Sequence, residues 1–398
     1  MIKRERYLSK IRPFIGKPVI KIITGIRRCG KSVLLSLIVE ELKESGMGDN
    51  NILNINFETA EGIRLSKKER LITHIKDFLE GKKAKCYLFL DEVQLVPGWE
   101  RVVNSLQVDY DVDIYITGSN ATLLSGDLST LLAGRYVAFQ IHPFSFSEFL
   151  QIHQEKMPVK ALFQQYIRFG GMPFLKYMNL DYEASMQYLT DVYSSVVIKD
   201  IVTYNRIREV DLLNRIVRYT LDNIGRTFSA NSISRYFKSE GRKVAVDTIL
   251  NYLSACENAF LIRKVKREDL RGKKLLKVHE KYYVEDHGFR EAVLANNNAE
   301  IQLILENIVY MEMISRGFKV TVGKYEEREI DFICIRNKEK LYLQVAYLLM
   351  DEATIKQEFS VYKEISDNYP KYVLSLDDFN FSREGIIHMN IIDFLCEG

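Results

Sequence analysis

Several features are scarce in this chain of 398 residues, and each scarcity excludes a class of protein. Only 7 prolines occur, which argues against long disordered linkers. The 5 cysteines lie far apart without a C-x-x-C pair, so neither a disulfide framework nor a zinc site is expected. No segment reaches the roughly 18 uncharged apolar residues of a membrane helix, and the amino terminus lacks an apolar leader. We therefore expect a cytoplasmic protein without a membrane span.

The overall charge is also small. A formal net charge of +3 does not indicate a partner, so any basic surface must come from local clustering. The chain is long enough for two to four domains, and a hydrophobic content of 47% suffices for their cores.

The most informative stretch is Gly25–Ser32, which fits the phosphate-binding pattern G-x-x-x-x-G-K-[ST]. An apolar run, Val19–Thr24, precedes it and predicts a strand; Val33–Leu42 follows and predicts a helix. A loop at this place offers backbone N–H groups and a helix dipole to an anion. We expect Lys31 to reach the β- and γ-phosphates of ATP and the Ser32 hydroxyl to ligate Mg²⁺.

A second strand, Cys86–Leu90, is continuously apolar and ends in Asp91 and Glu92. A continuous apolar run is typical of a parallel strand that is buried on both faces. Its carboxyl end would place Asp91 beside the Mg²⁺ and Glu92 beside the attacking water. The residues expected to contact the nucleotide or its metal are Gly25, Arg27, Arg28, Cys29, Gly30, Lys31, Ser32, Val33, Asp91 and Ser119.

Three further side chains are candidates with alternatives. Ser119 and Asn120 end the strand predicted from residue 112, where a polar group could sense the γ-phosphate or could simply cap a turn. Arg135, before a strand at 137–143, could stabilise transition-state charge in its own subunit or a neighbour's, or form a salt bridge. Cys29 lies beside the predicted phosphate site, so we expect ATP to protect its thiol from alkylation.

These motifs occur in order, followed by Leu132-Ala133-Gly134-Arg135-Tyr136 and Pro143-Phe144-Ser145-Phe146. Together they resemble the prokaryotic AAA-type ATPases that carry a C-terminal domain of unknown function, related to the archaeal ATPases of the STAND/AAA+ side of the P-loop class. The resemblance covers the whole chain and implies a five-stranded parallel core with a helical lid.

The remaining chain divides into three predicted parts. Residues 147–225 have helical patterns and form the lid, with Phe169–Pro173 as a break and hinge. Residues 226–285 predict two helices and two strands around a basic turn, the order of a winged helix. The candidates for DNA contact there are Arg242, Lys243, Thr248, Asn251, Lys264, Lys266, Arg267, Arg271, Lys273 and Lys274. The second helix lacks Arg and Lys, so contact would be to phosphates, and a protein interface is an alternative.

Residues 286–398 predict a helix and three strands that resemble the PD-(D/E)xK nuclease core. Glu306, Asp331 and Gln344 stand where that fold implies metal ligands, and Ala346 stands where it implies a lysine. Gln binds a hard cation more weakly than a carboxylate, and Ala transfers no proton. We therefore expect a degenerate, non-catalytic site, unless a lysine elsewhere, such as Lys324 or Lys340, replaces the missing one.

The combined expectation is an α/β protein: a P-loop AAA-type core at 1–146, the lid, a winged helix, and a small restriction-endonuclease-like domain. It would bind ATP and Mg²⁺, form a homo-oligomer, and couple hydrolysis to DNA binding or remodelling. The alternatives are a nucleotide-dependent signalling switch whose winged helix binds a protein, and a Mg²⁺-dependent nuclease.

Overall fold

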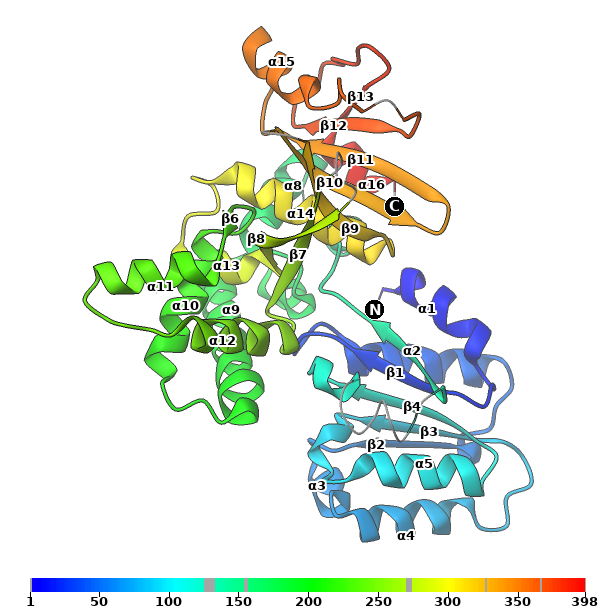
Figure 1. Ribbon diagram of the computed structural model, residues 1–398. Helices are drawn as coiled ribbons and strands as arrows, with labels where there is room; N and C mark the ends of the chain where they lie inside the picture. Colours follow the sequence, from blue (N-terminus) through cyan, green and yellow to red (C-terminus); the bar gives the residue numbers. More distant parts are fainter. Residues whose placement is uncertain are drawn as a thin grey trace. The chain divides into compact units, whose positions relative to one another are not determined.

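The computed structural model describes residues 2–124, 132, 134–153, 157–269, 274–325, 328–365 and 367–397, with the side chains of 122, 124 and 274–279 left aside. The described chain forms two compact units (Figure 1). The first comprises Met1–His142 together with Asn258–Phe260, and the second comprises Pro143–Glu257 and Leu261–Gly398.

The first unit alternates strands and helices. Its strands are β1 (Ile20–Thr24), β2 (Ile52–Asn56), β3 (Cys86–Asp91), β4 (Val112–Gly118) and β5 (Tyr136–Gln140). Its helices are α1 (Glu5–Ile11), α2 (Lys31–Glu44), α3 (Ala60–Leu65), α4 (Lys68–Leu79) and α5 (Trp99–Asp109). The strands form one parallel sheet in the order β2-β3-β4-β1-β5.

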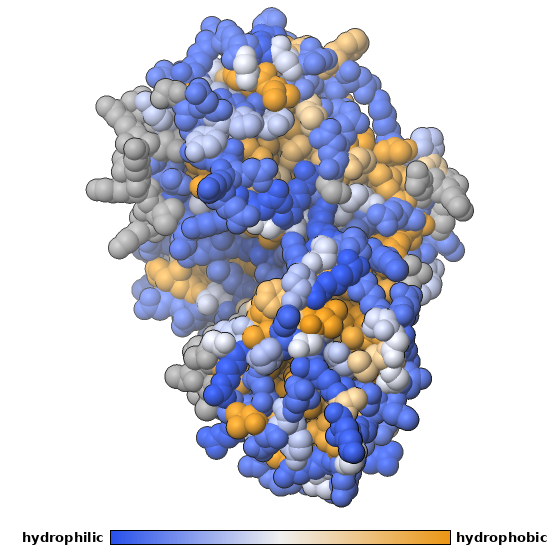
Figure 2. All heavy atoms as spheres, turned by 90° about the vertical axis from the view of Figure 1, so that its right-hand side faces the viewer, coloured by the Kyte–Doolittle hydropathy of each residue, from blue (hydrophilic) through white to orange (hydrophobic). Residues whose placement is uncertain are grey.

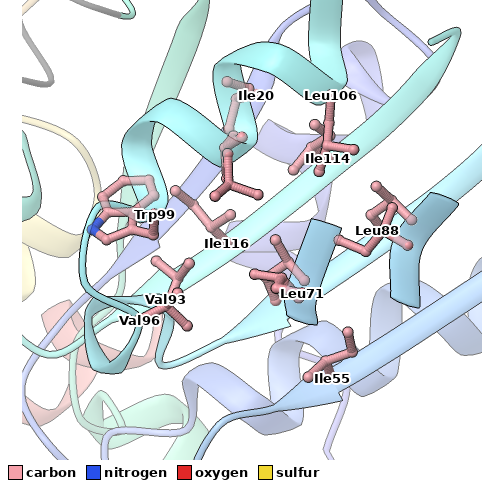
Figure 3. Close-up of a cluster of buried hydrophobic side chains, with 14 of the residues drawn as sticks. Ile20, Ile55, Leu71, Leu88, Val93, Val96, Trp99, Leu106, Ile114 and Ile116 are labelled. Atoms are coloured by element: carbon pink, nitrogen blue, oxygen red, sulfur yellow. The ribbon is translucent and has the colours of Figure 1, made fainter. Parts of the chain in front are cut away.

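A hydrophobic core fills one face of this sheet. Figure 3 shows strand residues such as Leu88, Ile114 and Ile116 facing Leu71 of α4 and Trp99 and Leu106 of α5. Helices α1 and α2 lie on the opposite face (Figure 1). Every residue of β3 and β4 is buried, as expected for central parallel strands that are covered on both faces.

The second unit begins with helices and ends in a mixed sheet. Its helices are α7 (Phe146–His153), α8 (Val159–Phe169), α9 (Tyr182–Ser195), α10 (Val210–Asp222), α11 (Ala230–Ser239), α12 (Val246–Asn258), α13 (His287–Leu294), α14 (Ile301–Ser315), α15 (Glu352–Ser360) and α16 (Ile391–Cys396). Its strands are β6 (Thr227–Phe228), β7 (Ile262–Asp269), β8 (Lys274–Val284), β9 (Lys319–Tyr325), β10 (Arg328–Arg336), β11 (Glu339–Val345), β12 (Lys371–Ser375) and β13 (Ile387–Asn390). A π-helical segment, Val196–Thr203, continues α9.

The predicted winged helix and nuclease-like segment share one sheet. Its eight strands run in the order β13-β12-β11-β10-β9-β7-β8-β6. The outer half of β7 pairs in parallel with β9, with Arg267 opposite Val322 and Asp269 opposite Lys324. The boundaries expected at 225 and 285 both fall inside the second unit. At 285, backbone hydrogen bonds join the hairpin to the strands that follow.

The break expected to act as a hinge is instead held on several sides. Gly171 N–H donates to Asp286 (2.9 Å), and the Gly171 carbonyl accepts from Phe144 N–H (2.7 Å). A Cβ on Gly170 would lie 1.9 Å from the Asp286 carboxylate, and one on Gly171 would lie 2.1 Å from the Phe144 carbonyl oxygen. The glycines thus permit a close approach of three backbone segments, and these contacts hold the predicted hinge in this structure.

The visible surface is mainly hydrophilic, with hydrophobic residues in separate patches (Figure 2). Among the described residues, no helix is both long and apolar enough to cross a membrane.

Candidate functional site

The phosphate-binding motif lies at the carboxyl edge of the first sheet. β1 ends at Thr24 and α2 begins at Lys31, so the loop leads directly into a helix N-terminus. Gly25 has φ 154° and Gly30 has φ 103°, conformations that an L side chain rarely adopts. A Cβ on Gly25 would also approach the Ile141 carbonyl oxygen to 2.4 Å. The two fixed glycines of the motif are therefore required by the backbone path itself.

Lys31 is buried and points back over its own loop. Its ammonium donates to the carbonyl oxygens of Gly25 (3.2 Å) and Ile26 (3.4 Å) and lies 3.3 Å from a carboxylate oxygen of Glu92. Burial acts to lower the pKa of Lys31, but the charge of Glu92 outweighs it, and the pKa is raised. Burial likewise acts to raise the pKa of Glu92, and Lys31 brings it below its usual value. Both groups are therefore charged at neutral pH.

Asp91 is held by hydroxyl and amide groups on neighbouring elements. Thr117 on β4 donates to one of its oxygens, and Asn56 at the end of β2 donates to the other (2.9 Å). The Ser32 hydroxyl also favours the charged form of Asp91. Burial raises the pKa of Asp91 even though these hydrogen bonds favour the charged form. The carboxylate and hydroxyl oxygens that the sequence assigned to Mg²⁺ thus lie together.

Glu92 adopts an unusual backbone conformation, with φ 59° in the left-handed region. For a residue with a Cβ this costs about 1 to 2 kcal/mol. Its N–H donates to the Thr117 hydroxyl (2.8 Å), and its carboxylate accepts from Gln94. Sequence reasoning missed Thr117, Gln94 and Asn56. The signal was available for Asn56 and Thr117, because both are polar residues at the carboxyl ends of apolar strands.

Ser119 and Asn120 are buried at this same edge. β1 and β4 are in register at Thr24 and Gly118, so Ser119 follows β4 where Gly25 follows β1. Their positions suit either the sensing or the capping interpretation. Arg27 pairs with Glu58 (3.1 Å), and its positive charge also helps to lower the pKa of Glu92.

The other loop residues differ in exposure. Arg28 has φ 69°, and Val33 in the first turn of α2 is 40% exposed. Cys29 is fully buried, so we no longer expect its thiol to react readily with an alkylating reagent in the folded protein. Its contribution to a phosphate site would come from the backbone.

Arg135 lies at the opposite edge of the sheet. The Arg135 carbonyl oxygen accepts a hydrogen bond from Ile20 N–H (2.8 Å) at the start of β1. The phosphate loop, by contrast, follows the end of β1. Five residues of strand separate Ile20 from Gly25, or about 16 Å. The Arg135 side chain donates to Asn104 of α5 (2.9 Å). The possibility that Arg135 acts on phosphates bound by its own subunit is therefore excluded by distance.

The arrangement around Lys31 has the chemistry of a nucleoside-triphosphate site. A helix N-terminus and an ammonium suit phosphate oxygens. Ser32 and Asp91 supply the hard oxygen ligands that Mg²⁺ prefers. Glu92 supplies a carboxylate beside them that could accept a proton.

Comparison with known proteins agrees with this reading. The sequence model of the AAA domain family matches residues 17–150, and a family described only as a domain of unknown function matches residues 160–300. An uncharacterized protein of Haemophilus influenzae is 36% identical over 100% of this chain and 99% of its own length. The chain belongs to the same family as that protein.

Two more distant proteins extend the comparison. An uncharacterized protein of Methanocaldococcus jannaschii is 27% identical over 94% of this chain and 85% of its own length. A Walker-type ATPase of Pyrococcus abyssi has a similar structure, with a TM-score of 0.52 and 14% sequence identity over 74% of this chain and 96% of that one. This likeness shows the fold. The first unit is an AAA domain with the parallel sheet of P-loop ATPases.

The second unit does bring together the residues of the predicted degenerate nuclease site. Asp331 N–H donates to the Gln344 side chain (3.2 Å), and the Asp331 carboxylate accepts from Val345 N–H (2.9 Å). Lys281 on β8, which sequence reasoning missed, projects among the carboxylates. Its ammonium lies 2.9 Å from Glu306 and 4.0 Å from Asp331.

Lys281 thus provides the cation in this cluster. It also contacts Glu329 (2.6 Å), while Tyr283 donates to Glu306. Burial acts to lower the pKa of Lys281, but the carboxylates around it raise the pKa well above the usual value. Among the described residues, no group of His, Cys, Asp and Glu side chains has the geometry to hold a metal ion. Lys340, one of the two lysines considered as replacements for the missing one, pairs instead with Asp367 (3.3 Å).

Three of the residues predicted to contact DNA form ion pairs with acidic side chains. Arg242 pairs with Glu209 (2.7 Å) and Asp211 (3.2 Å). Lys264 pairs with Glu280 (2.7 Å), and Arg267, whose side chain is 12% exposed, pairs with Glu329 (2.9 Å). These pairs reduce the positive charge available to phosphates.

The other candidates are less constrained or cannot be placed. Lys243, Asn251 and Lys266 are exposed, and Thr248 is half-buried. Arg271 and Lys273 lie outside the described residues, as does the side chain of Lys274.

Proposed function

We propose that this chain binds ATP with Mg²⁺ and hydrolyses it in its AAA domain. The observation that carries the proposal is the convergence of Lys31, Asp91 and Glu92 at the end of β1 and β3. All three side chains are buried. Lys31 and Glu92 form an ion pair, and Asp91 accepts a hydrogen bond from Thr117.

The Lys31–Glu92 pair gives this proposal a specific sequence of events. The ammonium that would bind the β- and γ-phosphates is held by the carboxylate that would activate water. Bound phosphate competes for Lys31 and releases Glu92 from the pair. Glu92, still oriented by Gln94 and Thr117, then accepts a proton from the attacking water. Bound Mg²⁺, held by Ser32 and Asp91, would supply charge stabilisation at the phosphates. Glu92 thus stays paired with Lys31, and cannot act as the general base, until ATP binds.

Two substitutions test the assignment. Lys31→Ala removes the ammonium and should abolish ATP binding in a fluorescent-nucleotide assay. Glu92→Gln keeps the shape but removes the base, so ATP should bind while turnover falls by roughly 10²- to 10⁴-fold. Glu40→Gln, an exposed carboxylate on α2, is the matched control and should leave both measurements unchanged. Turnover at the wild-type rate by Glu92→Gln would contradict the role of Glu92.

We further propose that the second unit couples nucleotide state to DNA, through phosphate contacts with little base specificity. The support is two exposed lysines, Lys243 between α11 and α12 and Lys266 on β7, together with the exposed polar residue Asn251 on α12. ATPase measured with single-stranded, duplex and branched DNA tests this. We expect stimulation that falls with salt, because phosphate contacts release counterions. Unchanged ATPase and no gel shift at low salt would refute it.

One observation favours the alternative of a nucleotide-dependent switch that binds a protein. Helix α12 carries no Arg or Lys, and it exposes Leu250 (42%) and Asp247. An apolar and an acidic residue suit a protein surface better than a DNA groove. Leu250→Lys separates the two: it should strengthen DNA binding if α12 faces DNA, and leave DNA binding unchanged if it does not.

Nuclease activity is the weakest of the three readings. The carboxylates that a divalent cation would need already surround Lys281, and Lys281, Glu306 and Asp331 are all buried. If any cleavage is observed, Asp331→Ala should leave it intact, because it would come from another source.

A further inference from the structure

Arg4 joins two segments of the AAA domain that meet beside the phosphate loop. Its guanidinium is almost fully buried and donates to the carbonyl oxygens of Cys29 (3.1 Å) and His142 (2.9 Å). Cys29 belongs to the phosphate loop, and His142 is the last residue of the first unit before the chain passes to the second. The planar fork of an arginine presents N–H groups to both acceptors in a fixed geometry, whereas a lysine ends in a single ammonium without such a fork.

The phosphate loop also touches the same exit segment directly. Ile141 N–H donates to the Thr24 carbonyl (2.8 Å), which continues the pairing of β1 with β5. A Cβ on Gly25 would lie 2.4 Å from the Ile141 carbonyl oxygen and 2.8 Å from the Cys29 sulfur. Because packed interiors are not continuously deformable, a change in the loop backbone must be accommodated by the exit segment.

Both neighbours of Pro143 are fixed within their own units. On the first side, His142 N–H donates to the Tyr7 hydroxyl (3.2 Å), and Arg4 lies over the Tyr7 ring at 4.6 Å. On the second side, Phe144 N–H donates to the Gly171 carbonyl (2.7 Å), and Tyr166 donates to the Phe144 carbonyl (2.9 Å). At this junction, one of the places where the chain passes between the units, a single proline with a φ fixed by its ring lies between two residues whose backbone groups are all hydrogen-bonded.

We propose that Arg4 is a positioning residue that couples the phosphate loop to this junction. The proposal rests on ATP binding by the AAA domain, as proposed above. When phosphate engages the loop N–H groups, the Cys29 peptide adjusts. Arg4 carries that adjustment to the His142 carbonyl, and Pro143 carries it to Phe144. Arg4 thereby supplies a contact through which the second unit responds to nucleotide.

Hydrogen–deuterium exchange at the Phe144 amide tests the coupling in the full-length protein. In the wild type, saturating ATP with Mg²⁺ should change the exchange rate of this amide by about fivefold or more, the lower range of coupling between sites. In Arg4→Met the change at Phe144 should fall below about twofold, while ATP still protects the loop amides of residues 26–32. Tyr7→Phe removes only the hydroxyl that holds His142 and should reduce the Phe144 response by half or more.

Lys3→Met is the matched control, because Lys3 is an exposed cation one residue away. It should behave as the wild type; a loss equal to that of Arg4→Met would show a charge effect and overturn the proposal. A full ATP response at Phe144 in both Arg4→Met and Tyr7→Phe would also overturn it, with ATP binding intact. Failure of the wild type to bind ATP would instead refute the proposed function, and the coupling with it. Arg4→Lys keeps the positive charge but loses the rigid fork, so it should give an intermediate response that separates lost positioning from lost charge.

Discussion

The Lys281 cluster allows a stability prediction whose size and pH dependence both follow from the structure. Lys281→Met keeps the length of the side chain but removes the cation that faces Glu306, Glu329 and Asp331. Removing one partner of a buried ion pair costs about 3 to 5 kcal/mol, because the other charge remains buried. Glu329 adds little to this, since it is 30% exposed and water screens it. We therefore expect the thermal midpoint of the second unit to fall by about 6 to 20 °C.

The pH dependence identifies the cause. Asp331 already has a pKa well above its usual value, because burial and Glu306 outweigh Lys281. Without Lys281 the folded-state pKa of Asp331 rises further above its unfolded value. The native state then retains protons that the unfolded state loses, so its stability falls as the pH rises above about 4. The deficit of Lys281→Met should accordingly be small near pH 4 to 5 and full at pH 8.

Differential scanning calorimetry of the wild type and variant across pH 4.5 to about 8 measures this. Lys319→Met, an exposed lysine on β9, is the control for loss of a charge from the same sheet. The double variant Lys281→Met/Glu306→Gln should recover part of the loss, because it removes one of the stranded carboxylates. A deficit of equal size at pH 5 and pH 8 would refute the electrostatic reasoning and indicate a packing defect instead.

Two other predictions concern the junction of Gly171 with Asp286, and one concerns the phosphate loop. Gly171→Ala should destabilise the second unit by about 1 to 3 kcal/mol, because the new Cβ meets the Phe144 carbonyl oxygen at 2.1 Å; chemical denaturation that shows no change would contradict the observed contact. Burial raises the pKa of Asp286 to about 7, although its carboxylate accepts hydrogen bonds from two backbone N–H groups. The native state therefore keeps a proton that the unfolded state loses, so the stability of the wild type should fall as the pH rises from about 4 to 7. In Asp286→Asn that slope should be absent, and a slope equal to the wild type in urea titrations would show that another group titrates. Cys29 should label slowly in the native protein, with or without ATP, and rapidly in urea; fast native labelling would mean that the loop opens.

The sequence was most informative where one local pattern determines one local structure. The strand, loop and helix around Gly25–Ser32 form as predicted, because the glycine spacing, the apolar run and the helix-forming segment all agree. The strand before Asp91 also forms, since its continuous apolar character matches a sheet covered on both faces. The AAA domain was therefore recognisable from residues that act close to their own position in the chain.

Features that depend on tertiary pairing were not predictable in the same way. The hairpin of β7 and β8 was expected, but its parallel pairing with β9 joins segments about fifty residues apart, which no local pattern encodes. The same limitation affected Lys281. It was included in a predicted strand, yet its role depends on α14 and β10 being placed around it. The Gly170–Gly171 break looked like a hinge because the sequence does not reveal that Asp286 would hold it.

The strand register around Arg135 allows a test of whether this residue acts in hydrolysis. β5 is parallel to β1, with Tyr136 opposite Ile20 and Gln140 opposite Thr24, so Arg135 and the phosphate loop lie at opposite edges of one sheet. If Arg135 contributes to hydrolysis, the phosphate it contacts must be bound by another copy of the chain. Arg135→Ala and Lys31→Ala should then each be inactive alone, while their mixture regains part of the wild-type ATPase in mixed assemblies. The mixture supplies an intact Lys31 from one chain and an intact Arg135 from the other. If Arg135→Ala alone retains full ATPase at every protein concentration, Arg135 has no role in catalysis and its hydrogen bond to Asn104 is structural.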